Sequence, residues 1–213
     1  MIKFQNVSVE IKGKRILNNI NLTVNDGEFV LLCGESGCGK TTLTRLVNGM
    51  IPHFIKDVKV DGTVTVNDLD IAESPMYKIA ESVGSVFQNP KTQFFNTDSS
   101  AEIAFGLENI GADRDYMHKR VAQTISDLKI ENLADRNVFS MSGGEKQLLA
   151  FASIYAMNPQ IYVLDEPSAN LDHEAIEKLR KILETVKKSG HTVLIAEHLS
   201  LIHISEPTRP RLI

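Results

Sequence analysis

Short apolar runs alternate with amphipathic stretches along most of the chain. Continuous runs such as residues 29–33 and 161–164 are typical of strands that are buried on both faces of a sheet. Other stretches repeat their apolar residues with a period near 3.6, which is typical of helices that pack on one side. We predict strands at residues 2–9, 28–33, 62–66, 82–87, 160–164 and 192–196, several of which are continuous apolar runs. We predict helices at residues 40–48, 101–109, 116–128, 143–157 and 174–188, and the last of these shows the 3.6-residue period.

The order of these elements predicts a mixed α/β fold. Strands and helices alternate after residue 28, which favours a mostly parallel sheet, whereas the N-terminal strands favour an antiparallel one. Residues 89–158 are rich in predicted helix, and we interpret them as a helical subdomain inserted into a core made of 1–88 and 159–198. The apolar face of the last helix, which should pack on the sheet, consists of Ile176, Leu179, Ile182, Leu183 and Val186.

Composition narrows the possible functions. The 213 residues carry a net charge of −4 without a long basic run, which argues against a nucleic-acid partner. The 2 cysteines, Cys33 and Cys38, are expected to be reduced, as in a cytosolic protein. No apolar stretch approaches the roughly 18 residues that a membrane-spanning helix needs, so we expect any membrane role to require a partner.

A glycine-rich loop follows the apolar run 29–33 and has the pattern G-x-x-x-x-G-K-T. Such a loop between a strand and a helix turns backbone N–H groups toward an anion, and the helix dipole adds to the attraction. We expect Lys40 to reach the terminal phosphates of a nucleotide and the Thr41 hydroxyl to bind Mg²⁺. A glycine-rich turn that binds nothing is the alternative. The predicted phosphate-binding residues are Gly34, Ser36, Gly37, Cys38, Gly39, Lys40, Thr41 and Thr42.

Two adjacent carboxylates end the apolar run 161–164. A buried strand delivers Asp165 and Glu166 to the carboxyl edge of the sheet, where ligands bind in open α/β folds. Asp165 would hold Mg²⁺, and Glu166 would activate a water molecule as a general base. In isolation an ordinary acidic turn before Pro167 would be the favoured interpretation, whereas beside the phosphate loop the catalytic one is favoured.

A second glycine-rich segment, Ser142, Gly143, Gly144 and Glu145, begins a predicted helix. Ser-x-x-Glu is a capping box, which by itself only starts the helix. However, two glycines in the first turn cost roughly 1 kcal/mol each relative to alanine, which suggests that another group approaches the backbone there. Helix capping and anion binding are compatible, and both interpretations stay open.

Together these motifs resemble those of ATP-binding-cassette (ABC) ATPases, over residues 2–198. Residues 34–41 resemble the Walker A motif, 161–166 the Walker B motif and 141–147 the family signature. Gln88 matches the Q-loop, residues 168–172 the D-loop, and His198 the switch histidine. The resemblance implies a P-loop (RecA-like) core with an antiparallel β subdomain and an inserted α-helical subdomain. A surface amide at Gln88 and an uninvolved strand-end histidine at His198 are the plain alternatives.

The resemblance also implies a mechanism and its residues. Two subunits, identical or related, would enclose ATP and Mg²⁺ between the phosphate loop of one and residues 142–145 of the other. Thr41, Gln88 and Asp165 would bind the metal, while Glu166, His198, Lys40 and Gln88 would act in hydrolysis. Asp172 would contact the nucleotide interface. Family members usually stack adenine on an aromatic side chain at a position that Ile11 occupies here, so we expect weaker nucleotide binding.

Within the family, residues 48–54 and 87–95 most resemble ATPases of energy-coupling-factor importers. That resemblance implies an ATP-hydrolysing subunit on the cytoplasmic face of the cell membrane. It would power an integral membrane transporter component for a vitamin or a transition-metal ion. The alternative is a soluble mechanical ATPase of the same family acting on ribosomes or chromosomes. The long coiled-coil heptads of chromosome-structuring relatives are absent between the two glycine-rich segments.

The last residues resemble no element of this family. Residues 199–209 match one reading frame of a common transposase sequencing adapter, so we interpret 199–213 as translated adapter rather than native sequence. An unusual natural C-terminus is the alternative. On the adapter interpretation, the native chain would continue after His198 with at least another strand and helix.

Overall fold

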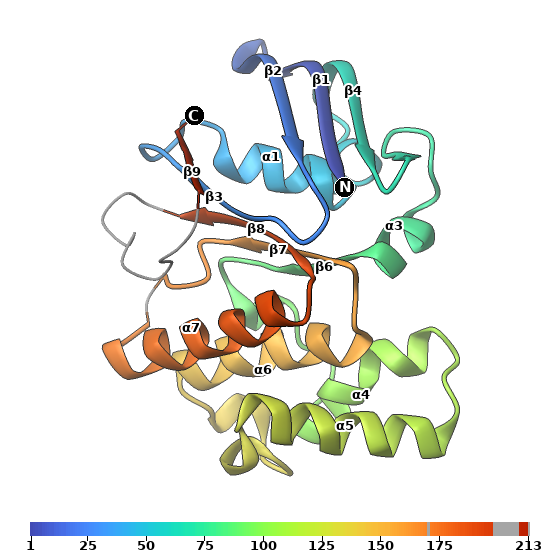
Figure 1. Ribbon diagram of the computed structural model, residues 1–213, viewed down its shortest axis with the longest axis vertical. Coiled ribbons are helices and arrows are strands. Elements are labelled where there is room, and N and C mark those ends of the chain that lie inside the picture. Colours follow the sequence, from blue (N-terminus) through green and yellow to red (C-terminus); the bar gives the residue numbers. More distant parts are fainter. Residues whose placement is uncertain (170, 198–208, 213) are drawn as a thin grey trace.

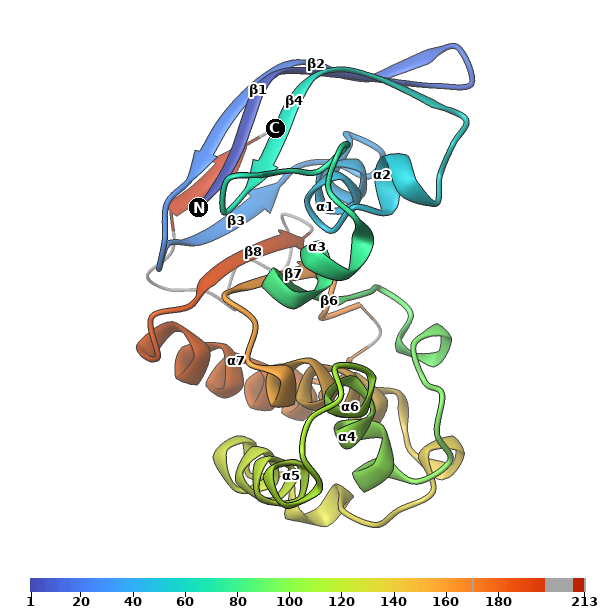
Figure 2. The ribbon, with the colours of Figure 1, turned by 90° about the vertical axis from the view of Figure 1, so that its right-hand side faces the viewer.

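Helix α1 (Lys40–Val47) lies between two sheets in the computed structural model, which describes residues 1–169, 171–197 and 209–212. Figure 1 and Figure 2 show an antiparallel sheet on one side of α1 and a parallel sheet on the other. Helices α6 and α7 cover the opposite face of the parallel sheet, and α4 and α5 lie beyond α6. The predicted mixed α/β fold is therefore confirmed. These four helices are α4 (Ser99–Asn109), α5 (Arg114–Leu128), α6 (Gly143–Met157) and α7 (His173–Lys188).

The parallel sheet has 5 strands in the order β6-β7-β8-β3-β9. Its strands are β6 (Val83–Val86), β7 (Ile161–Asp165), β8 (Thr192–Glu197), β3 (Phe29–Cys33) and β9 (Arg209–Leu212). Alternate residues of β3 enter different cores: Leu31 packs toward α6 and α7, and Leu32 packs toward α1 and the antiparallel sheet. Burial on both faces explains why β3, β7 and β8 are largely apolar runs.

The antiparallel sheet has 4 strands in the order β2-β1-β4-β5. Its strands are β1 (Ile2–Ile11), β2 (Lys14–Val24), β4 (Val58–Val66) and β5 (Leu69–Asp70). Strand β2 is absent from our sequence prediction. Along β2 only Leu17 and Val24 are buried, and its pairing with β1 contains register shifts, so it lacks the regular alternation that identifies a half-buried strand.

The two helices whose start is marked by a capping residue in the sequence, α6 and α7, agree well with the prediction. Helix α6 has the predicted bounds, and in α7 four of the five predicted apolar residues are buried, while Ile176 is only half-buried. Short elements were not predicted: α2 (Met50–His53), α3 (Met76–Ser82) and 3₁₀ turns at Pro90–Thr92, Glu131–Leu133 and Val138–Ser140.

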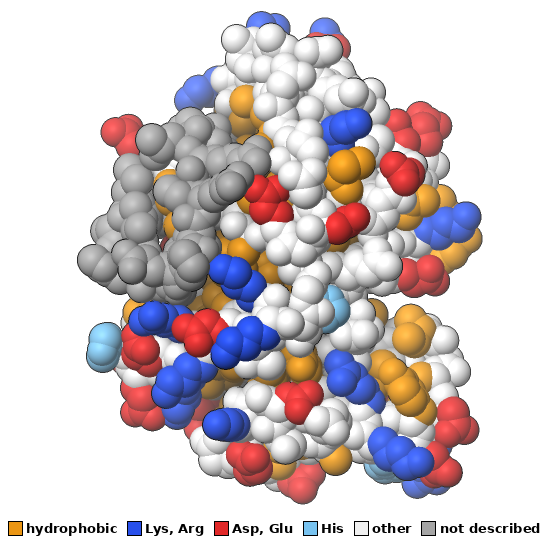
Figure 3. Space-filling model, viewed as in Figure 1, with side chains coloured by type: hydrophobic (Ala, Val, Ile, Leu, Met, Phe, Trp, Pro, Cys, Tyr) orange, Lys and Arg blue, Asp and Glu red, His pale blue; other side chains and the backbone are white. Residues whose placement is uncertain are grey.

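The outer face of α7 is covered by charges of both signs (Figure 3). Glu174 pairs with Lys178, and Arg180 pairs with Glu177 and Glu184, each within the helix. Among the helices of the described residues, none is long and apolar enough to span a bilayer.

Candidate active site

The glycine-rich loop joins β3 to α1, as predicted. Gly37 and Gly39 have φ angles of 80° and 105°, which only glycine adopts without strain. At Gly39 an added Cβ would also lie 2.6 Å from Leu17 Cδ2. Among the described residues, no side chain caps the N-terminus of α1, and its first turn holds no acidic residue. The first N–H groups of α1 therefore keep their capacity to bind an anion.

The Lys40 side chain folds back over this loop and is buried, with only 4% of its surface exposed. Its Nζ donates to the carbonyl oxygens of Gly34 and Glu35, both at 2.9 Å, and lies 3.9 Å from Cys38 Sγ. Carbonyl oxygens are neutral acceptors, so they orient the ammonium group without cancelling its charge. Cys33 and Cys38 are both free thiols, as predicted.

Asp165 connects the loop to β7. The Thr41 hydroxyl donates to Asp165 Oδ1 at 3.0 Å, across 124 positions of sequence. Burial raises the pKa of Asp165, the hydrogen bond from Thr41 lowers it, and the nearby charge of Glu166 raises it again. A hydroxyl and a carboxylate are hard oxygen ligands of the kind that Mg²⁺ prefers, and a cation would relieve the cost of burying this charge.

Glu166 follows in a left-handed backbone conformation, with φ of 48°. This conformation costs roughly 1–3 kcal/mol in a residue with a side chain and persists only where neighbouring groups hold it. The Glu166 N–H donates to Ala196 O at 2.8 Å, and its carboxylate accepts from Gln88 Nε2 at 2.7 Å. Asp165 and Glu166 thus face different partners, as the sequence suggested, and Gln88 contacts the predicted general base.

The second glycine-rich segment forms a complete capping box. Glu145 N–H donates to Ser142 Oγ at 3.2 Å, and Ser142 N–H donates to Glu145 Oε2 at 2.8 Å. Arg136 adds an ion pair to Glu145 at 2.6 Å, and the hydrogen bond from the Ser142 backbone together with Arg136 lowers the pKa of Glu145. Arg136 has no counterpart in our sequence analysis, because nothing local marks its partner.

Gly144 has a reason to be glycine that lies within the chain itself. A Cβ at this position would come within 2.9 Å of Ala175 Cβ on α7, closer than real Cβ contacts. Helix packing therefore explains Gly144 without a ligand. Gly143 instead lines a cavity of about 390 Å³ together with Gln88, Lys146 and Leu171. This cavity therefore lies between the second glycine-rich segment and the loop that carries Gln88.

The remaining predicted residues are more dispersed. Asp172 caps α7 by accepting from Ala175 N–H at 2.8 Å, and Thr42 is buried in the first turn of α1. Ile11 lies at the end of β1, opposite Lys14, and packs against the core of the antiparallel sheet. His198 lies outside the described residues. Within the described part of the chain, no group of three or more His, Cys, Asp or Glu side chains is placed to hold a metal ion.

A buried carboxylate beside this site escaped the sequence analysis. Glu197 ends β8 and is 2% exposed, and its Oε1 accepts from the N–H of Ser168 at 3.0 Å and also from the Ser168 hydroxyl. Ser168 follows Glu166 by two positions. The only sequence signal for this contact is a charge at the end of an otherwise apolar strand.

Comparison with known proteins places these residues in a family. The sequence model described as ABC transporter matches residues 17–169. An ABC transporter ATP-binding protein of Treponema denticola is 48% identical over 200 residues, which are 93% of this chain and 41% of the relative. One from Pyrococcus furiosus is 38% identical, over 88% of this chain and 69% of the relative. The chain thus spans only 41%, 40% and 34% of the length of three relatives, two from Treponema denticola and one from Methanosarcina mazei.

Solved structures share the fold. The structure of cbiO1 from Clostridium perfringens, described as part of the ABC transporter complex cbiONQ, has a TM-score of 0.81 at 31% identity. That match covers 92% of this chain and 78% of cbiO1. The ABC transporter cassette MJ0796 also has a TM-score of 0.81, at 24% identity, over 100% of this chain and 94% of MJ0796. This second likeness concerns the fold.

Proposed function

The chain belongs to the ABC transporter family of ATP-binding proteins, and we propose that it is the ATP-hydrolysing subunit that powers a membrane importer. One observation carries the proposal: the phosphate loop, Asp165, Glu166 and Gln88 meet at one edge of the parallel sheet. Lys40 and the N-terminus of α1 would bind the phosphates of ATP, and Thr41 and Asp165 would hold Mg²⁺. The bound metal would neutralise charge on the phosphates during hydrolysis.

The residues of this chain would divide the work of hydrolysis. Glu166 would accept a proton from the attacking water, and Gln88, which contacts its carboxylate, would orient it and complete the metal site. In the proposed dimer, residues 142–145 and Asp172 of one subunit would face the nucleotide held by the other, and Ile11 would contact adenine. We retain His198 as a proposed contact to the terminal phosphate. We likewise retain the division into a core and a helical subdomain at 89–158.

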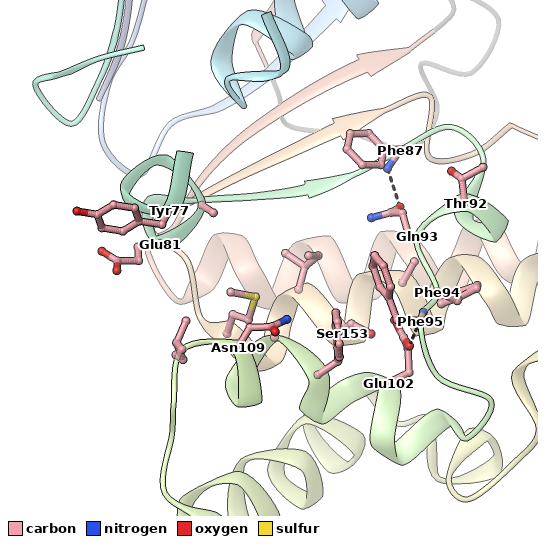
Figure 4. Close-up of a pocket in the computed structure, with 17 residues that line it drawn as sticks. Tyr77, Glu81, Phe87, Thr92, Gln93, Phe94, Phe95, Glu102, Asn109 and Ser153 are labelled. Atoms are coloured by element: carbon pink, nitrogen blue, oxygen red, sulfur yellow. Dashed lines mark hydrogen bonds between the residues drawn. The ribbon is translucent and has the colours of Figure 1, made fainter. Parts of the chain in front are cut away.

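An apolar groove beside Gln88 supports a membrane partner. The groove, of about 670 Å³, lies between α3, α4, α6 and the loop after β6 (Figure 4). Phe95 and Tyr77 border it with 74% and 62% of their surface exposed. The buried Glu102 holds its rim by accepting from the N–H groups of Phe95 and Asn96, at 3.0 and 2.7 Å. We propose that a cytoplasmic segment of the integral membrane component docks here, with the ATPase peripheral on the cytoplasmic face.

The class of importer is the finer part of the proposal. The resemblance of residues 48–54 and 87–95 and the similarity to cbiO1 support an energy-coupling-factor importer for a vitamin or a transition-metal ion. Co-purification of the full chain from membranes, with and without ATP, tests this. Recovery of an integral membrane protein supports the importer, whereas recovery of ribosomes or chromosomal DNA supports the mechanical alternative.

The variant Glu166→Gln tests the catalytic assignment. We expect ATP hydrolysis by the full chain to fall roughly 10²–10⁴-fold, the contribution typical of a general base. ATP binding should remain and ATP-dependent dimers should accumulate on size-exclusion chromatography. The matched control is Glu174→Gln, the same chemical change on the exposed face of α7. Hydrolysis at the parental rate in Glu166→Gln would show that the base lies elsewhere.

A further inference from the structure

We propose that Glu197 is a positioning residue, which holds residues 166–168 in the geometry that ATP hydrolysis requires. This inference rests on the function proposed above. It concerns the reaction at the same edge of the sheet and assigns a role to a side chain that accepts hydrogen bonds from Ser168, two positions after Glu166.

The burial of Glu197 requires an explanation. The rest of β8 is threonine and apolar residues, and all six of its residues are buried. Removing a carboxylate from water is strongly unfavourable unless it is hydrogen-bonded in place. Glu197 Oε1 accepts both the N–H and the hydroxyl of Ser168, which is itself 3% exposed. Hydrogen bonds to an ionised acceptor are the stronger kind, so the pair forms a firm tie between β8 and the turn after β7.

The Ser168–Glu197 hydrogen bonds connect β7 and β8 beyond their last paired residues. The register of β7 and β8 ends at Asp165 opposite Ala196, and the next residue, Glu166, donates its N–H to Ala196 O at 2.8 Å. Two positions later the Glu197 side chain replaces the backbone as the acceptor. Residues 196–197 therefore bind the backbone N–H of Glu166 before Pro167 and that of Ser168 after it. The Glu166 side chain leaves the backbone between these two hydrogen bonds.

Glu166 needs such support. Its φ of 48° is an unfavourable conformation that relaxes if the turn is released. Its carboxylate must point at the attacking water, and a displacement near 1 Å can reduce catalysis by about 10²-fold. Loss of the Ser168 attachment would remove one support from this turn, while the Glu166 N–H would still donate to Ala196 O, its carbonyl would still accept from Ala169 N–H, and its carboxylate would still accept from Gln88.

Glu197 also borders the strand that leads into the phosphate loop. It lies opposite Cys33 in the pairing of β8 with β3, and Cys33 directly precedes Gly34. Burial raises the pKa of the Cys33 thiol, and the negative charge of the neighbouring Glu197 raises it further. One carboxylate thus contacts the turn that carries the proposed base and faces the strand that carries the phosphate loop.

The test compares substitutions at both ends of the tie in the full chain. We expect Glu197→Ala to lower kcat for ATP hydrolysis roughly 10–100-fold, the effect typical of residues that orient catalytic groups, while KM changes little. Glu197→Gln keeps an oxygen acceptor and should lose much less. Ser168→Ala should lower kcat in the same direction, and the double variant Ser168→Ala/Glu197→Ala should be no slower than Glu197→Ala alone, because both act through one contact.

Two further measurements distinguish a specific role of Glu197 in positioning Glu166 from a general loss of structure. Thr192→Val removes a partly buried hydrogen bond, which Gly27 N–H donates to Thr192 Oγ1 at the opposite end of the same strand, and we expect it to leave kcat near the parental value. Hydrogen exchange without nucleotide should show the Ser168 amide losing protection in Glu197→Ala.

Four results would each overturn the proposal: an unchanged kcat in Glu197→Ala, an equal loss in Thr192→Val, additive losses in the double variant, or an unchanged Ser168 amide. A parent chain without ATPase activity would instead refute the proposed function, and the inference with it.

Discussion

Replacing Gly144 with alanine should reveal why the signature segment contains this glycine. The new Cβ would lie 2.9 Å from Ala175 Cβ, so α6 and α7 must separate to reach ordinary contact. Overpacking of this kind costs about 1–3 kcal/mol. The helix preference of alanine over glycine returns about 1 kcal/mol. Gly144→Ala should therefore lower the free energy of unfolding by about 1 kcal/mol.

The second variant, Ala175→Gly, removes the opposing Cβ. In that background nothing obstructs alanine at position 144, because the next nearest atom, Leu171 Cδ2, is 3.9 Å away. Gly144→Ala should then raise the free energy of unfolding by about 1 kcal/mol, through helix preference alone. The sign of one substitution reverses between two backgrounds, which corresponds to a coupling of about 2 kcal/mol, within the range seen for residues in contact.

Urea denaturation of the parent, both single variants and the double variant measures this coupling. A destabilisation by Gly144→Ala that persists unchanged in the Ala175→Gly background would refute the packing explanation. ATPase assays on the same proteins test the second proposed role of Gly144, which is contact with the nucleotide held by the other subunit. We expect the double variant to hydrolyse ATP more slowly than the parent although its stability is recovered. The reason is that the nucleotide held by the partner subunit is proposed to approach the backbone at position 144, where a Cβ would obstruct it. Full activity in the double variant would leave packing as the sole reason for this glycine.

Three other perturbations test the site. Lys40→Ala removes a charge that would bind phosphate, and it should weaken ATP binding roughly 10–100-fold by calorimetry. Burial raises the pKa of Asp165, so its stabilising contribution exists below the unfolded pKa and is lost as pH rises through the folded one. Asp165→Asn should therefore melt higher at neutral pH, by about 2–4 °C for each kcal/mol relieved, while Mg²⁺-dependent hydrolysis falls. The pKa of Glu145 is lowered from 4.5, so its contribution is complete above that value and disappears as pH falls through the folded pKa. In Glu145→Gln the free energy of unfolding should consequently decrease less between neutral and acidic pH than in the parent. Urea denaturation midpoints measured across this pH range test this.

Local signals explain which parts of the fold could be predicted. The start of α6 follows from its capping box, and α7 begins at an Asp172 cap that the sequence displays. Continuous apolar runs identified β3, β7 and β8 because both faces of that sheet are covered. In each case the cause lies within a few residues of the element.

The parts that could not be predicted depend on distant partners. Strand β2 becomes a strand through its pairing with β1, although its own residues alternate poorly. The contact of Gly144 with Ala175 joins two helices, and the bonds of Ser168 to Glu197 span 29 positions. No window of sequence contains both members of such a pair, so the glycine suggested a ligand and Glu197 suggested nothing.

The carboxyl edge of the parallel sheet gathers more negative charge than the fold alone would favour. Asp165 and Glu197 are buried there, Glu166 raises the pKa of Asp165, and the cations that lower this pKa are Arg45 and the buried Lys40. Because like charges in a buried region oppose one another, this arrangement reduces stability unless a further cation joins it. A divalent ion held by Thr41 and Asp165 would supply that charge. Repulsion between these carboxylates lowers the stability of the fold in the absence of the cation. For this reason we expect Asp165→Asn to raise stability and to lower ATPase activity at the same time.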